Sequence, residues 1–196
     1  MIDIAKAIEQ ANKKQSKIDA STIQELVGLS SPRVRHLLNN LASQSNTYLE
    51  VGCYLGGTLR AALHGNTLEY AAAVDNFSMN PSKRVEFFKN TSMLNFEFFE
   101  EDSFTLDVSK FKKPFELYFY DGHHSFESQY KAIEHFLPAM ANEFVYVCDD
   151  WDMKKIPNAT FSACKNLNLH VEEVHNLPGG ENKEWWGGIG IVRIRK

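Results

Sequence analysis

Short apolar runs alternate with helical patterns along most of the chain. Seven runs rich in aliphatic, aromatic and β-branched residues predict strands at residues 47–51, 70–75, 96–100, 115–120, 143–148, 169–177 and 188–194. The segments between them predict helices at residues 58–64, 82–89, 126–140 and 160–167. Strands that alternate with helices are typical of an α/β sheet covered on both faces. The connection between the last two strands is short enough for an antiparallel hairpin.

The first 45 residues predict helices instead of strands. Ser21–Gln24 has the pattern of a capping box that opens a short helix. Ser31 and Pro32 predict the cap and the first-turn proline of a further helix. We therefore divide the chain into an N-terminal helical cap, residues 1–45, and an α/β domain, residues 46–196. The cap covers one edge of the sheet, roofs a substrate pocket or pairs two subunits, and the sequence leaves these alternatives open.

The composition is that of a folded and slightly acidic protein. Hydrophobic residues make up 43% of the 196 residues, which is enough for the core of one α/β domain. The formal net charge of −4 lacks the positive field that a phosphate backbone needs, so we expect no nucleic-acid partner. No apolar run reaches the ~20 residues of a membrane span. The three cysteines, Cys53, Cys148 and Cys164, form no C-x-x-C pair, and we expect free thiols in a cytoplasmic protein.

A cluster of glycines follows the first predicted strand. Gly52, Gly56 and Gly57 stand between this strand and the next helix. Glycine adopts positive φ angles and lets a ligand approach bare backbone, so the turn predicts a nucleotide site, with a tight turn that holds no ligand as the alternative. Tyr54 stands where the dinucleotide fingerprint G-x-G-x-x-G needs a glycine, which argues against an NAD enzyme.

The run Glu50-x-Gly52-x-x-x-Gly56-x-Thr58 resembles motif I of the class I S-adenosylmethionine-dependent methyltransferases. The resemblance covers the whole α/β domain and implies a Rossmann-like, doubly wound sheet of seven strands in the order 3-2-1-4-5-7-6, with the last strand antiparallel. It implies that the glycine loop, together with Tyr54 and Thr58, passes under the methionine part of the cofactor. It also implies that Glu50 lies near the amino group of the cofactor.

Polar residues end the second and third predicted strands. Asp75 ends the second strand, where a carboxylate can accept both hydrogen bonds of a ribose diol, so we place Asp75 and the adjacent Asn76 in the cofactor site. At the end of the third strand, the resemblance implies that Asp102 and Ser103 meet the adenine amino group. An Asx turn at Asp102 is the alternative.

Three acids end the fourth and fifth predicted strands: Asp121, Asp149 and Asp150. Ligands of open α/β sheets lie outside the carboxyl ends of the strands, and neighbouring strands are ~4.8 Å apart, so these carboxyl groups should converge. Unpaired, they would repel one another and raise each other's pKa. A divalent cation removes this repulsion, and hard oxygen donors suit Mg²⁺, with Ca²⁺ and Mn²⁺ as the alternatives. Capping of the next helices and solvation of a cleft are the alternative roles.

The sequence Asp121-Gly-His-His, followed by Asp149 and Asp150, is similar to that of the metal-dependent small-molecule O-methyltransferases, which act on catechols, macrolide sugars and rhamnosyl groups. The resemblance implies that the three acids hold Mg²⁺, that Asp121 also borders the cofactor, and that the metal binds two neighbouring substrate oxygens. The catechol enzyme has an amide at the place of Asp150 and a catalytic lysine near the strand-four acid. Here histidines follow that acid, and we favour His124 over His123 as the general base. A capping role or no role is the alternative for each.

These observations predict an S-adenosylmethionine-dependent enzyme that methylates a hydroxyl group of a small vicinal diol, sugar or phenol. A metal-independent methyltransferase and a nucleoside-binding module without activity are the alternatives. Trp151, Trp185 and Trp186 are candidate walls for the acceptor or ordinary packing aromatics. The expected partners are the small acceptor and, through the N-terminal helices, a second copy of the chain. We expect no membrane partner.

Overall fold

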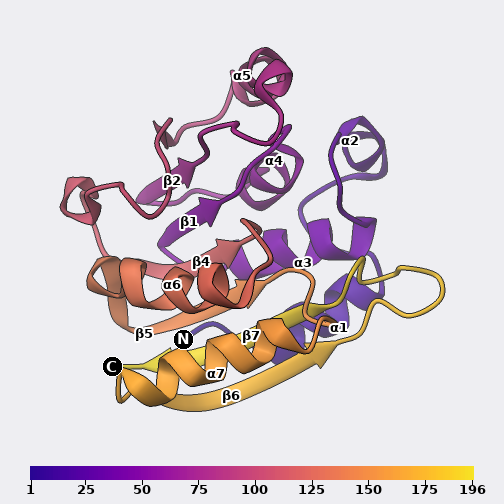
Figure 1. Ribbon diagram of the computed structural model, residues 1–196. Coiled ribbons are helices and arrows are strands. Elements are labelled where there is room, and N and C mark those ends of the chain that lie inside the picture. Colours follow the sequence, from indigo (N-terminus) through magenta and orange to yellow (C-terminus); the bar gives the residue numbers. More distant parts are fainter.

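The computed structural model describes all 196 residues, and a seven-stranded sheet runs through its centre (Figure 1). The strands are β1 (Thr47–Val51), β2 (Tyr70–Val74), β3 (Glu97–Phe99), β4 (Phe115–Tyr120), β5 (Met140–Cys148), β6 (His170–Leu177) and β7 (Ile189–Arg195). Their order is β3-β2-β1-β4-β5-β7-β6. β7 is antiparallel to β5 and β6, and the other neighbours are parallel. The predicted fold class, strand order and antiparallel last strand are confirmed.

Helices cover both faces of the sheet. They are α1 (Ile4–Asn12), α2 (Ala20–Glu25), α3 (Pro32–Ala42), α4 (Gly57–Leu63), α5 (Arg84–Thr91), α6 (Phe126–Phe136) and α7 (Lys155–Asn166), with 3-10 turns η1 (Pro81–Lys83), η2 (Val108–Lys110) and η3 (Leu137–Ala139). Alternate strand residues supply two cores, because successive side chains point to opposite faces. Tyr48 and Leu117 pack with α1, α3 and α4, whereas Leu49 and Tyr118 pack with α6 and α7. None of the helices is long and apolar enough to cross a membrane.

Two helix starts differ from the sequence expectation. α2 is capped by Asp19 and not by Ser21, because the Asp19 carboxylate accepts hydrogen bonds from the backbone nitrogens of Ser21 and Thr22 at 2.9 and 2.8 Å. α7 begins at Lys155 and not at residue 160. Pro157 stands in its first turn, where the missing N–H group would have had no helical partner, so the proline does not prevent the earlier start.

The N-terminal helices belong to the helical layer of the sheet. α1 and α3 share a core with the sheet, and the residues on either side of α2, Ile18 and Leu26, pack on Ala61 of α4. The side chain of Asn39 in α3 donates hydrogen bonds to the carbonyl oxygens of Ala61 and His64, both at 2.8 Å. The apolar faces of α1 and α3 are therefore used within the chain. The domain boundary at residue 45 and pairing of two chains through these helices stay predictions.

Backbone hydrogen bonds continue one residue beyond several strands. Each of four residues donates its N–H to the last carbonyl group of the neighbouring strand: Asp75 to Phe99 at 3.2 Å, Gly52 to Val74 at 3.0 Å, Asp121 to Val51 at 2.8 Å and Asp149 to Tyr120 at 3.2 Å. These bonds set Asp75, Gly52, Asp121 and Asp149 in one row along the carboxyl edge of the sheet. We call these four residues the edge row.

Candidate functional site

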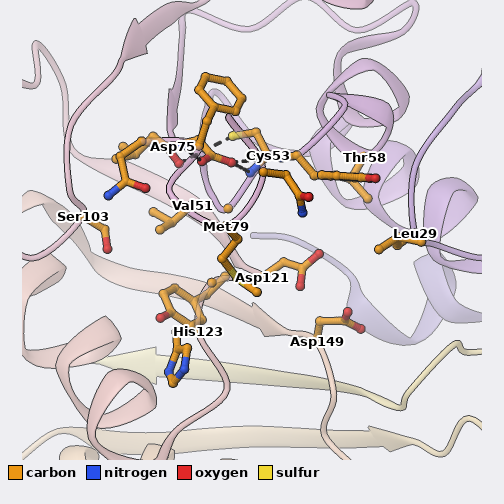
Figure 2. A pocket seen from close by; sticks show the side chains of 18 of the residues that line it. Leu29, Val51, Cys53, Thr58, Asp75, Met79, Ser103, Asp121, His123 and Asp149 are labelled. Carbon is orange, nitrogen blue, oxygen red and sulfur yellow. Dashed lines mark hydrogen bonds between the residues drawn. The ribbon is translucent and has the colours of Figure 1, made fainter. Parts of the chain in front are cut away.

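A cleft of about 550 Å³ opens along the edge row (Figure 2). Most residues that the sequence assigned to a site line this cleft: Gly52, Tyr54, Thr58, Asp75, Asn76, Asp102, Ser103, Asp121, His123, His124, Asp149 and Asp150. Glu50 and Gly56 do not line it. The structure therefore brings the glycine loop and the strand-end acids together in one cavity, of the size that small ligands and cofactors occupy.

Asp75 holds the glycine loop in place. Its Oδ2 atom accepts hydrogen bonds from the backbone nitrogens of Cys53 and Tyr54, at 2.7 and 2.9 Å, and its Oδ1 atom accepts one from Phe77 at 2.7 Å. Tyr54 has a positive φ of 47°, an unusual conformation that these bonds stabilise. A carboxylate has about four acceptor positions, so about one is left for a ribose hydroxyl group. The sequence predicted that Asp75 contacts a ligand, but it did not predict that Asp75 also holds the glycine loop through hydrogen bonds.

Two glycines of the loop allow close backbone contacts. A Cβ atom on Gly52 would lie 2.1 Å from the carbonyl oxygen of Asp121, so glycine is required for the ends of β1 and β4 to meet. A Cβ atom on Gly57 would lie 1.8 Å from the carbonyl oxygen of Val27. The second contact sets the connection between α2 and α3 against the loop, and Gly28, Leu29 and Ser30 of this connection line the cleft. Part of the N-terminal segment thus lines the cleft, and a roof over a substrate stays a prediction.

Glu50 lies behind the loop and is fully buried. Its carboxyl group accepts hydrogen bonds from the Tyr48 hydroxyl at 2.5 Å and from Thr58 Oγ1 at 2.7 Å, which joins β1 to α4. Burial raises the pKa of Glu50 to about 8, so the side chain is mostly neutral at pH 7. Glu50 does not line the cleft, so the expected contact of Glu50 with the amino group of a cofactor stays a prediction.

Asp102 forms the Asx turn that the sequence offered as one of two roles. Its Oδ1 atom accepts a hydrogen bond from the backbone nitrogen of Phe104 at 2.9 Å, which is an Asx turn. Its Oδ2 atom lies 3.4 Å from the Asn76 amide nitrogen, and Asn76, Asp102 and Ser103 all line the cleft. Contact of Asp102 or Ser103 with an adenine ring stays a prediction.

The three strand-end acids converge around His124. The imidazole Nε2 atom lies 3.5 Å from Asp121 Oδ1, and Nδ1 lies 2.6 Å from Asp150 Oδ2. Hydrogen bonds to Asp121 and Asp150 raise the pKa of His124 to about 10. Burial, and then the neighbouring charges of Asp121 and Asp150, raise the pKa of Asp149 to about 9. Burial also raises the pKa of Asp121. The predicted convergence is present, and the pKa values of Asp121 and Asp149 are raised, with burial as the largest cause in both.

His124 is not a suitable general base in this arrangement. With a pKa of about 10 it is an imidazolium at neutral pH and has no free position for a proton. The sequence did not show that His124 pairs with two carboxyl groups. This pairing favours His123, and which of the two histidines is the base stays a prediction. His123 is exposed, lines the cleft and has its Nδ1 atom 3.4 Å from Ser128 Oγ. Its role as the base stays a prediction.

The acids fit a hard cation in chemistry but are not arranged around one. No group of three or more His, Cys, Asp or Glu side chains has the geometry to hold a metal ion. The Asp149 Oδ1 atom is buried and has no hydrogen-bond partner, so it is free to accept a cation. His124 supplies the positive charge between Asp121 and Asp150. Mg²⁺ binding therefore stays a prediction, with the donor atoms that Mg²⁺ prefers in place.

The structure separates the three tryptophans. Trp151 and Trp185 are buried, and the Trp151 ring packs edge-on against Phe161 with centroids 5.9 Å apart, so both are packing aromatics. Trp186 is only partly buried and lines the cleft. Leu29 and Met79 also line it although both are exposed, and no local sequence signal placed them there.

Several solved structures share this fold at low sequence identity. The methyltransferase PaMTH1 from Podospora anserina, bound to SAH, matches with a TM-score of 0.62 and 13% identity, over 100% of this chain and 89% of that one. The O-methyltransferase from Bacillus cereus, in complex with SAH, matches with a TM-score of 0.63 and 13% identity, over 97% and 91%. An rRNA methylase from Streptococcus thermophilus matches with a TM-score of 0.56 and 14% identity, over 83% and 93%. Likeness at this level shows the fold alone.

Sequence comparison is more specific. No curated protein matches the sequence. The family described as "Methyltransferase domain" matches residues 49–151, which run from β1 to Trp151, directly after the acids of β5. This match spans more than half of the chain and includes the entire edge row. The chain belongs to the methyltransferase domain family.

Proposed function

We propose that the protein transfers a methyl group from S-adenosylmethionine to a hydroxyl oxygen of a small molecule, with a divalent metal ion beside the acceptor. The observation that carries this proposal is the edge row, because it sets the glycine loop and the acids of β4 and β5 in one cleft. The SAH bound to the Podospora anserina and Bacillus cereus proteins of the same fold supports the choice of cofactor.

The proposed cofactor position follows from the walls of the cleft. The sulfonium part lies over Gly52, which has no side chain, and beside Tyr54, and the ribose reaches the remaining acceptor position of Asp75. Asn76 and Asp102, which lie close to each other in the same cleft, border the adenosine. The carboxyl groups favour a sulfonium cation over the uncharged sulfur of the product, which assists exchange of product for substrate.

The reaction is an in-line displacement at the methyl carbon. An acceptor oxygen forms the new bond to carbon, the carbon–sulfur bond breaks with its electron pair left on sulfur, and the acceptor hydroxyl group gives up its proton. Holding the two reactants in line at about 3 Å supplies much of the rate enhancement. Asp121, Asp149 and Asp150 would hold the metal ion, which when bound lowers the pKa of a coordinated hydroxyl group. His123 is the side chain of the cleft that we propose as proton acceptor.

The proposal is tested by titrating the protein with S-adenosylmethionine in a calorimeter and by assaying methyl transfer to a panel of diols, sugars and phenols. We expect binding in the micromolar range and turnover that EDTA abolishes and Mg²⁺ restores. A protein that does not bind S-adenosylmethionine would overturn the proposal. Glu127→Gln, an exposed change on α6, is the matched control for changes of the acids and should behave as the wild type.

A metal-independent methyltransferase is the second candidate. It is favoured by His124, because the imidazolium already balances the charge of Asp121 and Asp150 without a metal ion. Turnover that survives EDTA would select this candidate. A binding module without activity would bind S-adenosylmethionine and SAH equally well and would methylate nothing in the panel.

A further inference from the structure

The strand β6, at one end of the sheet, has a free edge. It pairs with β7 on one side and with no strand on the other (Figure 1). β6 has 8 residues, whereas β3 at the opposite end of the sheet has 3. Edge strands accept further strands, and proteins commonly protect them with lysine, proline, a bulge or a short length. β6 contains no lysine or proline, and its one bulge, at Glu172, leaves residues 173–177 as a regular edge.

The backbone groups of Val174 and Asn176 point out of the sheet at this edge. The Lys196 nitrogen donates a hydrogen bond to the Asn142 carbonyl oxygen at 2.9 Å, which continues the register of β7 on β5. Hydrogen-bonded pairs alternate along antiparallel strands, so even-numbered residues of β7 bond to β5 and odd-numbered ones bond to β6. The odd-numbered residues of β7 lie opposite three residues of β6: Glu173, His175 and Leu177. The N–H and C=O groups of Val174 and Asn176 are therefore left for a partner strand.

Apolar side chains also remain exposed beside this edge. Val174 is 45% exposed and Val171 is 39% exposed. Val174 lies opposite Val192 and Val171 lies opposite Ile194, and directly opposed residues point to the same face of a sheet. Val192 and Ile194 belong to the core beneath α7, so both exposed valines lie on the α7 face of the sheet. A strand added to β6 would cover part of their surface.

We infer that the partner strand is β6 of a second copy of the chain, paired antiparallel about a two-fold axis through Val174, so that the two sheets join into one. In this register Val174 lies opposite its own copy, and its outward N–H and C=O groups bond to those of that copy. Glu173 lies opposite His175 on each side of the axis. These side chains are complementary, since within one chain Glu173 Oε1 already lies 2.6 Å from His175 Nε2. A two-fold contact uses the same patch on both copies and closes at a dimer.

Charge favours this register over its neighbours. An axis through Glu172 or Glu173 would set two identical carboxylates opposite each other, and like charges directly opposite destabilise a sheet. An axis through His175 would set Glu173 opposite Leu177, which offers the carboxylate no hydrogen-bond donor. The axis through Val174 instead gives each Glu173 carboxylate an imidazole as its neighbour across the contact.

Sedimentation velocity of the full chain, from about 1 to about 100 μM, measures the association. We expect a dimer with a dissociation constant in the micromolar range. Val174→Pro removes an outward N–H group but no hydrogen bond to β7, so it should raise the dissociation constant at least about tenfold and leave the circular dichroism spectrum unchanged. Val174→Ile keeps the N–H group and the branched apolar side chain, and it should associate as the wild type does.

Cysteine variants report the register directly. Val174→Cys sets two thiols opposite each other with Cα atoms about 5.5 Å apart, a separation that a disulfide spans. Mild oxidation of the folded protein should therefore give a covalent dimer on a non-reducing denaturing gel. Asn176→Cys is the matched control on the same exposed edge, because position 176 lies opposite Glu172 and not opposite itself. It should stay monomeric on the gel. The natural cysteines Cys53, Cys148 and Cys164 are buried.

Three results would each overturn the inference. A chain that is monomeric over the whole concentration range would leave this edge to a strand of another protein. A dimer that Val174→Pro leaves intact would move the contact to another surface, such as the N-terminal helices. Equal cross-linking of Asn176→Cys and Val174→Cys would exclude the axis through Val174, and the gel decides this even if the proline variant fails to fold. None of these readouts depends on methyl transfer, so the proposed function is tested separately.

Discussion

The Nδ1 atom of His124 lies 2.6 Å from the Oδ2 atom of Asp150, so an imidazolium stands where three strand-end acids converge. This pairing leaves Asp149 as the acid without a cationic partner, and its Oδ1 atom is buried and unbonded. With a pKa raised to about 9, Asp149 is mostly protonated at pH 7. Asparagine, whose amide has the same shape as a neutral carboxyl group, should therefore replace Asp149 without disturbing the folded protein.

We expect Asp149→Asn to leave the free energy of unfolding at pH 7 within about 0.5 kcal/mol of the wild type, because it replaces one neutral side chain by another. The same change should lower turnover at least about 100-fold, because an amide is a poorer metal ligand than a carboxylate. Urea unfolding measures the first effect and a methyl-transfer assay the second. A large loss of stability would show that Asp149 is ionised in the folded protein.

Asp75→Ala should weaken the glycine loop and the cofactor site together. It removes the acceptor of three backbone hydrogen bonds, so we expect the free energy of unfolding to fall by about 2–4 kcal/mol. The affinity for S-adenosylmethionine, measured by calorimetry, should fall at least about tenfold. Asp107→Ala is the matched control, since Asp107 also accepts a backbone hydrogen bond, from Ser109, but lies outside the cleft. Its cofactor affinity should equal that of the wild type.

The buried Glu50 should make stability fall as pH rises. Burial raises its pKa to about 8 in the folded protein, whereas an unfolded glutamate has a pKa near 4.5. Between these values the folded chain holds a proton that the unfolded chain has lost, so the stabilisation is complete below pH 4.5 and is lost on the way to pH 8. The slope that Glu50 contributes is at most about 1.4 kcal/mol per pH unit.

Glu50→Gln isolates this contribution. Asp149 and His124 also have raised pKa values and act in the same direction, but they remain in the variant. Urea unfolding at pH 5, 6, 7 and 8 should therefore show a shallower decline for Glu50→Gln than for the wild type. Parallel curves for the two proteins would contradict a buried neutral Glu50.

The sequence was sufficient to predict the sheet and the positions of the strand-end acids. β4 spans the predicted residues 115–120, and the strand order follows the resemblance at the glycine loop. Asp121 and Asp149 could be placed together because parallel strands end at the same edge. These conclusions depend on local pattern and on general rules of topology, both of which a single sequence contains.

Other features depend on contacts between distant segments. Because side chains alternate along a strand, the sequence places Glu50 on the same face of the sheet as Tyr48. Only the packing of α4 on this face shows that Thr58 donates a hydrogen bond to Glu50. The pairing of His124 with Asp150 depends on the turn after β5, where Asp150 has a positive φ of 54°. Leu29 reaches the cleft because its segment lies on Gly57, a contact that no local pattern signals.

Gly57→Ala tests that contact. The new methyl group would meet the backbone of Val27, which cannot move as a flexible side chain does, so we expect a loss of about 2 kcal/mol or more in the free energy of unfolding. Gly180→Ala is the control, since its Cβ would meet no atom within 4 Å and only its φ of 66° disfavours alanine. That change should cost about 1 kcal/mol. If the two variants lost equal free energy of unfolding in urea, the segment that holds Val27 would have to move away from the new methyl group at little cost.

β7 inserts between β5 and β6, although it is the last strand of the chain. A growing polypeptide can pair β1 with β4 and β4 with β5 early, but the gap beside β5 stays unfilled until residues 189–195 leave the ribosome. The hydrogen bond from the Ser31 hydroxyl group to the carbonyl oxygen of Glu184 likewise joins an early segment to a late one. The side of the cleft that Trp186 lines is thus closed by residues that are made after β1 to β5, so the glycine loop can be in place before the whole cleft is.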